Sequence, residues 1–409
     1  MHTGKQDFLP SPPSPPSIDC RLPTIYLPNR GSGMTAIANR LRIAQVAPLA
    51  ERVPPRKYGG TERVVAALTD ELVRRGHEVT LFASGDSETL ARLEAIVPVG
   101  LRLMPGTQMP RDHYPALMAE LGQVYARAGE FDLIHNHNDY FAFPLAHLSN
   151  TPTLTTLHGR LDLPTLPVIY TAYPKAPVNS ISMDQRYPLP QAHWVGNVYN
   201  GVDLSHFTMG DGSGGYFAFL GRISSDKGIA QAIEIARRTG IPLKIAAKID
   251  DDQPDYYDWI KEDLNGPLVE WIGEISEHDK SAFLGNARAL LFPVQWPEPF
   301  GLALAEAMAC GTPVLATAYG AVPEVVVNGV TGFVCATTDA LVAAACRLDE
   351  VSRHACRAHV EAHFSASTMT TGYERLYRQL IGARTAMEAP IPRTLDAEYA
   401  RDTMLSIGE

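Results

Sequence analysis

Residues 216–248 read YFAFLGRISSDKGIAQAIEIARRTGIPLKIAAK. The first and last parts of this stretch are short apolar runs of strand length, and apolar residues recur every three or four positions between them, as on a helix face. A strand, a helix and a second strand in this order predict a βαβ unit with parallel strands. The alternation continues to the apolar run TPVLATA (residues 312–318), which predicts one parallel sheet for this half of the chain.

The first half of the chain shows the same alternation. RIAQVAP (residues 42–48) and HEVTLFAS (residues 77–84) flank a helical pattern that follows Gly59 and Gly60, and a glycine-rich linker, GDGSGG, separates the two halves. We therefore predict an α/β protein of two Rossmann-like domains, whose parallel sheets face each other across a cleft. The predicted parts are a disordered leader (1–33), a first domain (34–207), a second domain (208–364), a terminal helix packing back on the first domain (365–383) and a tail (384–409).

Composition excludes several classes of protein. The net charge is −10 and the excess of acid lies in the second half, which disfavours nucleic acid as a partner. The sequence contains no run of about 18 apolar residues, so we expect no integral membrane segment. Five scattered cysteines without a CxxC pair fit a reduced, cytoplasmic protein. The Pro/Ser-rich start lacks the pattern of a signal peptide, and Met34 is an alternative start of the chain.

The richest candidate stretch is PEPFGLALAEAMACGTPV, within residues 293–326. Glu298 lies in a loop after a predicted strand, Gly301 and Leu302 open a helix, and Glu306 follows one turn later. Free amides at a helix start attract oxygen atoms and negative charge, and carboxylates bind vicinal sugar hydroxyls. The alternative, with even weight, is that Glu298 caps the loop and Glu306 lies on a solvated helix face.

Two further stretches are candidates for binding phosphate. In GRISSDKG (residues 221–228), Arg222 and Lys227 lie five positions apart across a strand–helix corner, which suits a diphosphate; a surface ion pair is the alternative. Gly59 and Gly60 allow backbone amides to approach a ligand, although a tight turn explains them nearly as well.

Histidines and aspartates offer weaker signals. His158, at the end of a strand in TLHGR, is expected to face the cleft, or else to be satisfied by local backbone. In HNHND, His135 and His137 share a strand face, but no further ligands complete a metal site, so we expect no metal. The run Asp250–Asp252 is expected to cap the helix that follows it.

Together these residues resemble the family-four retaining glycosyltransferases of the GT-B fold. The resemblance covers residues 42–383, and its most specific element is EPFGLALAE (residues 298–306) followed by AMACGTPV and GAVPE. GRISSDKG at the right distance upstream, together with YGGTERVV, TLHG and VYNGVD, strengthens it. The resemblance implies an acceptor domain first and a nucleotide-sugar domain second.

The resemblance also implies roles for single residues. Glu306 would bind the ribose, and Arg222 with Lys227 would hold the diphosphate. Gly59 and Gly60 would close over the phosphates, and His158 would contact the sugar at the reaction centre. The donor sugar would be held by Glu298 with Phe300, Gly301 and Leu302, and the base would lie near Ile275.

The expected reaction is transfer of a hexose, with retention, from a nucleotide-sugar such as UDP-glucose or a related UDP- or GDP-hexose. It needs no cofactor and no metal, and the acceptor is a small molecule or saccharide, expected to be soluble. The alternatives are a GT-B nucleotide-sugar epimerase and a catalytically idle nucleotide-sugar-binding protein. The sequence leaves open whether Lys248 touches the donor, and residues 161–176 are expected to form an acceptor-side loop.

Overall fold

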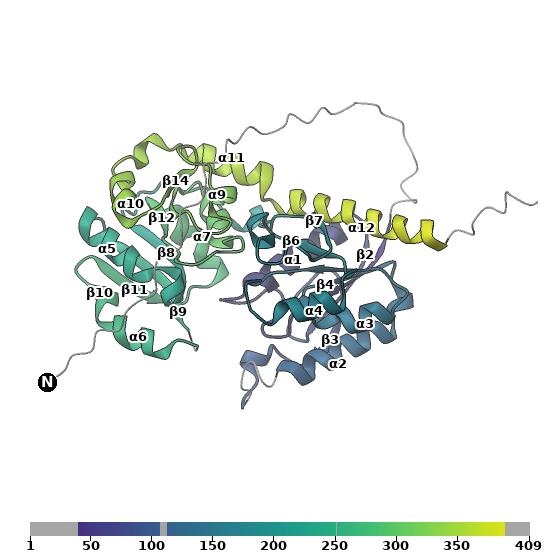
Figure 1. Ribbon diagram of the computed structural model, residues 1–409. Helices are drawn as coiled ribbons and strands as arrows, with labels where there is room; N and C mark the ends of the chain where they lie inside the picture. Colours follow the sequence, from purple (N-terminus) through teal and green to yellow (C-terminus); the bar gives the residue numbers. More distant parts are fainter. Residues whose placement is uncertain (1–39, 107–112, 251, 389–409) are drawn as a thin grey trace, which may run out of the picture. The chain divides into compact units, whose positions relative to one another are not determined.

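The computed structural model describes residues 40–106, 113–250 and 252–388. It contains two seven-stranded sheets, ordered β3-β2-β1-β4-β5-β6-β7 and β10-β11-β9-β8-β12-β13-β14 (Figure 1). Strand pairs are parallel in both sheets except for β10 with β11 at one edge. The two parallel-sheet α/β domains predicted from the alternation of strands and helices are therefore confirmed. The predicted leader and residues 389–409 of the predicted tail lie outside the described residues.

The first sheet has its topological switch point at β1, which lies between β2 and β4. The chain leaves β1 in one direction to β2 and β3 and returns on the other side to β4, so loops at the carboxyl ends of β1 and β4 diverge and leave room for a ligand. Its elements are β1 Arg42–Val46, α1 Gly60–Arg74, β2 Glu78–Ser84, β3 Arg92–Val97, α2 His113–Ala126, β4 Leu133–Asn136, α3 Phe143–Leu148, β5 Thr153–Thr156, α4 Leu166–Ala172, β6 Val178–Ser180 and β7 Trp194–Asn197.

The second sheet repeats this plan with its switch point at β8, between β9 and β12. The expected strands and helices of residues 216–248 form β8, α5 and β9. The remaining elements complete the sheet and its helices. The full set is β8 Phe217–Ile223, α5 Ile229–Thr239, β9 Leu243–Ile249, α6 Pro254–Ile260, β10 Asn265–Gly266, β11 Val269–Gly273, α7 Glu277–Gly285, β12 Ala289–Phe292, α8 Leu302–Ala309, β13 Val314–Thr317, α9 Val322–Val325, β14 Gly332–Cys335, α10 Thr338–Ala345, α11 Arg353–His363 and α12 Ala366–Glu388.

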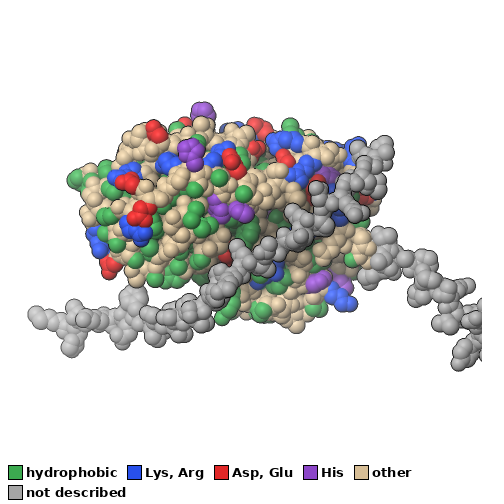
Figure 2. All heavy atoms as spheres, turned by 90° about the horizontal axis from the view of Figure 1, so that it is seen from above, with side chains coloured by type: hydrophobic (Ala, Val, Ile, Leu, Met, Phe, Trp, Pro, Cys, Tyr) green, Lys and Arg blue, Asp and Glu red, His purple; other side chains and the backbone are tan. Residues whose placement is uncertain are grey.

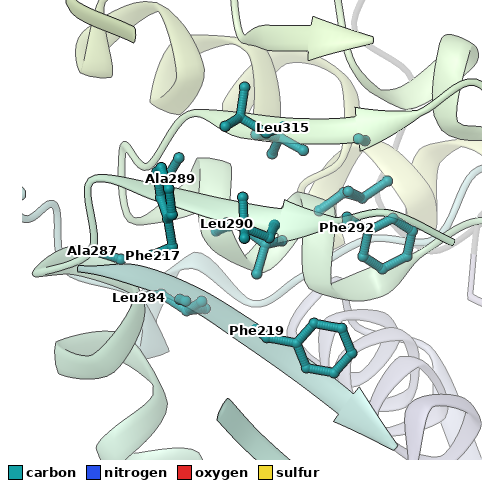
Figure 3. Close-up of a cluster of buried hydrophobic side chains, with 14 of the residues drawn as sticks. Phe217, Phe219, Leu284, Ala287, Ala289, Leu290, Phe292 and Leu315 are labelled. Carbon is teal, nitrogen blue, oxygen red and sulfur yellow. The ribbon is translucent and has the colours of Figure 1, made fainter. Parts of the chain in front are cut away.

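The core of the second sheet explains why its strands are almost continuously apolar. Strands β12 and β13 are buried along their whole length, as expected where helices cover both faces of a parallel sheet. Figure 3 shows Phe217 and Phe219 of β8 beside Leu290 and Phe292 of β12, with Leu315 of β13 beyond them. Such packing fixes the strand ends, and the loops that leave them are held by a rigid frame.

The helix α12, which is yellow in Figure 1, lies against α1. Its residues Tyr373 and Tyr377 are fully buried in a cluster with Ile43 of β1 and Leu68 of α1. Helix α12 thereby contributes side chains to the core of the first sheet.

None of the described helices is both long and apolar enough to cross a bilayer. On the face drawn in Figure 2, basic and acidic side chains are interspersed, so this face carries no broad patch of a single sign.

Candidate functional site

The eleven predicted site residues line two adjoining pockets. The first pocket has a volume of about 190 Å³. It is lined by the segment around Gly59 in the first domain and, in the second, by strand β9 and the loops after β8, β11 and β12. The second pocket, of about 340 Å³, shares much of that lining. The first contains Gly59, Gly60, Lys227, Ile275, Glu298, Gly301, Leu302 and Glu306, and the second adds His158, Arg222 and Phe300.

Glu298 lies buried in the loop between β12 and α8. Its Oε2 accepts hydrogen bonds from Lys227 Nζ at 2.5 Å and from Trp296 Nε1 at 3.2 Å. Lys227 Nζ also lies 5.0 Å from the centre of the Trp296 ring, a cation–π distance. The two pocket residues predicted on separate motifs are therefore partners of each other.

Gly320 packs closely against the backbone of Glu298. Its φ is +59°, and a Cβ there would lie 2.6 Å from the carbonyl carbon of Pro297 and closer still to the backbone nitrogen and oxygen of Glu298. The next residue, Ala321, donates its N–H to the Glu298 carbonyl oxygen at 2.8 Å. Only glycine combines this left-handed conformation with so close an approach.

Helix α8 begins at Leu302 with Gly301 as its N-cap, at a φ of +78° and without a side-chain cap. The first amides of a helix have no intrahelical partner, and they carry the positive end of the helix dipole. This end of α8 faces both pockets, because Gly301 and Leu302 line each of them. It provides donors for an oxygen-rich ligand.

Glu306, one turn into α8, is only 3% exposed, which rules out the alternative of a solvated helix face. Its Oε1 accepts from Lys280 Nζ at 2.7 Å and lies 3.6 Å from Arg63 Nε. Glu277 pairs with the same two cations, at 2.9 Å from Lys280 and 2.6 Å from Arg63. The carboxylate is thus held by two cations at the pocket wall, and sequence reasoning missed both Lys280 and Arg63.

Arg222 lies near the end of β8, as predicted, but it is already paired. Its Nη1 donates to Asp250 at 2.6 Å, and its Nη2 lies 3.5 Å from Asp226. The expectation that Asp250 caps the following helix is wrong: the N-cap of α6 is Gln253, without a side-chain capping bond. Because β8 and β9 are parallel neighbours, the residue after β9 lies beside the end of β8, which brings Asp250 to Arg222.

His158 lines the second pocket, but another side chain, not local backbone, satisfies one ring nitrogen. Its Nε2 lies 2.9 Å from Nδ1 of His137. Burial lowers the pKa of His158 to about 4, so the ring is neutral at neutral pH. This imidazole can exchange hydrogen bonds with a ligand but brings no positive charge to the pocket.

The HNHND motif serves a hydrogen-bond network. His135 and His137 share a face, with ring centres 4.0 Å apart, as expected for alternate strand positions. His135 bonds to Tyr377 and Thr156, and the second nitrogen of His137 bonds to Gln45. Within residues 40–106, 113–250 and 252–388, no three histidine, cysteine, aspartate or glutamate residues gather as metal ligands.

The structure also bears on Lys248 and on residues 161–176, whose roles the sequence left open. Lys248 lines the first pocket, with Nζ 5.2 Å from the ring centre of Tyr58, which lines the same pocket. Residues 161–176 are not a simple loop, because they contain helix α4 and bury Leu166 and Tyr170 in a core cluster.

The matching family models cover most of the described chain. Residues 58–206 match "Glycosyltransferase Family 4" and residues 211–353 match "Glycosyl transferases group 1". The chain is a family-four glycosyltransferase of the GT-B fold.

Named relatives of this glycosyltransferase are distant in sequence, but the alignments cover most of each relative's length. The glycogen synthase of Mycobacterium tuberculosis (strain H37Rv) is 26% identical, over 85% of this chain and 97% of the relative. A phosphatidyl-myo-inositol mannosyltransferase of Mycolicibacterium smegmatis is also 26% identical, over 73% and 82%. These names differ in donor and acceptor, so they support the transferase class and leave the substrates open.

Solved structures agree on the fold of the glycosyltransferase. Sucrose-phosphate synthase from Thermosynechococcus elongatus superposes with a TM-score of 0.68 at 21% identity, covering 84% of this chain and all of the other. Anabaena HepE in complex with UDP-glucose gives 0.65 at 16% identity, again over 84% and 100%. Both likenesses concern the fold alone.

Proposed function

We propose that this glycosyltransferase moves a hexose from a UDP- or GDP-linked donor, UDP-glucose foremost, to a soluble small-molecule or saccharide acceptor, with retention and without a metal. The observation that carries the proposal is the pair of buried carboxylates on either side of the α8 amino end, each held by cations at the pocket wall. Carboxylates suit sugar hydroxyls, and the helix end between them suits an anionic or hydroxyl oxygen.

In this proposal the donor lies along the pocket from Ile275 to His158. The base lies near Ile275, the ribose hydroxyls bind Glu306, and the diphosphate lies between Lys227, Arg222 and the amides of Gly59 and Gly60. Glu298 holds the sugar, with Phe300, Gly301 and Leu302 completing its wall. The presence of a UDP-glucose complex among GT-B proteins of this fold supports UDP-glucose as the first donor to test.

The Lys227–Glu298 bond suggests how donor binding prepares the site. A diphosphate competes with Glu298 for the ammonium group, since phosphate oxygens form strong charge-assisted hydrogen bonds. Once Lys227 turns to the phosphate, Glu298 is released to accept hydrogen bonds from sugar hydroxyls. The donor therefore replaces an internal ion pair with two ligand contacts.

Catalysis then depends mainly on stabilising the leaving diphosphate. Lys227 and Arg222 are the cations that act on the charge as it develops, which is how preorganised sites lower such barriers. The departing phosphate oxygen accepts the proton of the acceptor hydroxyl on the same face of the sugar, so the configuration is retained. His158, neutral at physiological pH, assists through hydrogen bonds.

The test is a calorimetric and thermal-shift screen of UDP, GDP and ADP and of their glucose, mannose and N-acetylglucosamine conjugates, with and without EDTA. We expect one nucleotide-sugar to bind selectively, with the same affinity in EDTA, and to be hydrolysed slowly with water as acceptor. Proton NMR of the first sugar released should show the anomer of the donor. Binding without turnover would favour an idle binding protein, and no binding would refute the donor site.

A further inference from the structure

A chain of buried hydrogen bonds joins His158 to the terminal helix. From His158, it passes to His137 at 2.9 Å and from His137 Nε2 to Gln45 Oε1 at 2.8 Å. Gln45 Nε2 donates to the Tyr377 hydroxyl at 3.2 Å, and that hydroxyl lies 2.7 Å from His135 Nδ1. Gln45, His135 and Tyr377 are completely buried, and His137 is 2% exposed, so water does not compete for these bonds.

The three imidazoles in this chain are neutral. Burial lowers the pKa of both His135 and His137 well below the ordinary value for histidine. A neutral imidazole has one N–H and one bare nitrogen, so fixing the role of one nitrogen fixes the role of the other. Each ring therefore passes the direction of its hydrogen bond on to the next partner.

The amide of Gln45 sets that direction. Its Oε1 can only accept, so His137 Nε2 carries the proton and His137 Nδ1 is bare. The bare nitrogen accepts from His158 Nε2, which leaves His158 Nδ1 without a proton. On the other side, the Tyr377 hydroxyl accepts from Gln45 Nε2 and donates its own proton to His135 Nδ1. The opposite arrangement requires the Gln45 amide to turn over.

We propose that Gln45 and Tyr377 are positioning residues that hold His158 as the Nε2–H tautomer, with Nδ1 as a hydrogen-bond acceptor toward a hydroxyl of the donor sugar. The importance of this tautomer for transfer rests on the proposed function, in which His158 contacts the sugar. The Tyr377 hydroxyl stabilises this arrangement by accepting from Gln45 Nε2 and donating to His135 Nδ1. A side chain of helix α12 thereby helps to set which atom of a pocket histidine offers a lone pair.

The experiment measures histidine tautomers by long-range proton–nitrogen NMR on the full chain labelled with ¹⁵N-histidine. His158 resonances are assigned from their absence in His158→Asn. In the wild type, we expect a protonated Nε2 and a bare Nδ1 at His158. In Tyr377→Phe, the amide loses its acceptor, so His137 and His158 should each become a mixture of tautomers.

Tyr216→Phe is the control. Tyr216 is also buried, but its hydroxyl donates to the carbonyl oxygen of Phe283, outside the network that joins His158 to Tyr377. This variant should keep the wild-type tautomer at His158. Gln45→Met, which removes the amide, is the second disrupting variant if Tyr377→Phe does not fold. A protonated Nδ1 at His158 in the wild type, or an unchanged His158 in a folded disrupting variant, would overturn the proposal.

Donor hydrolysis separates positioning from stability. Tyr377→Phe should lower kcat for hydrolysis of the selected nucleotide-sugar by about 10-fold, the scale of one hydrogen bond, and leave the affinity for the free nucleoside diphosphate unchanged. Tyr216→Phe should retain kcat. Equal kcat in the two variants would contradict the positioning role. If the proposed function fails because no donor binds, the tautomer measurement still decides this inference.

Discussion

Replacing Gly320 with alanine tests whether the backbone of Glu298 must be held in place. The new Cβ would lie 2.6 Å from the carbonyl carbon of Pro297, whereas ordinary contacts begin at 3.4 Å. The loop that carries Glu298 must therefore move by about 1 Å, and a misplacement of that size costs about 10²-fold in rate. The left-handed backbone adds about 1 kcal/mol of destabilisation.

Gly329→Ala is the matched control for this experiment. Gly329 also has a left-handed φ, +77°, in a turn of the same domain, but a Cβ there meets no atom within 4 Å. Gly329→Ala should lose about 1 kcal/mol in urea unfolding, and Gly320→Ala should lose more because its Cβ also meets backbone atoms. Only Gly320→Ala should lose donor hydrolysis. Hydrolysis by Gly320→Ala at the rate of Gly329→Ala would refute the reasoning.

Three further predictions concern charged groups in or beside the pockets. Lys227→Met should lower donor turnover by about 10²-fold through loss of phosphate stabilisation; turnover near that of the wild type would contradict the role. Glu306→Ala should lower the free energy of unfolding by about 3 kcal/mol, because Lys280 loses a buried partner, and it should also weaken nucleoside diphosphate binding. Urea titration measures the first effect and calorimetry the second. A loss of stability below about 1 kcal/mol would match only a surface ion pair and would contradict the prediction. Burial raises the pKa of Glu62 to about 7, so folding favours its protonated form and the wild type loses stability as the pH rises from 4.5 through 7. Glu62→Gln should therefore gain stability over the wild type between pH 5 and pH 8, by up to about 3 kcal/mol, and a gain independent of pH would contradict this.

The fold, and the gathering of the candidate residues around adjoining pockets, were predictable because they depend on local patterns. Strand and helix periods define parallel βαβ units, and the carboxyl ends of parallel strands meet at one edge of a sheet. Residues at or after the ends of different strands, such as Arg222 and Glu298, therefore line the same pocket although 76 positions separate them.

The partners of these residues were not predictable, because they depend on tertiary register. Asp250 reaches Arg222 through the pairing of β8 with β9, and a run of aspartates before a helix has the same local pattern as a cap. Tyr377 lies 242 positions from His135, to which it bonds, so no spacing rule connects them. The sequence was enough to select candidate residues that line common pockets, but the hydrogen-bond and ion-pair partners of each side chain required the fold.

A crystal structure with the nucleotide-sugar that the screen selects tests the central claim most directly. The account predicts the diphosphate on Lys227 and Arg222 beside the amides of Gly59 and Gly60, the ribose on Glu306, and Glu298 turned from Lys227 to the sugar. A nucleotide-sugar bound elsewhere, with the Lys227–Glu298 pair intact, would contradict it.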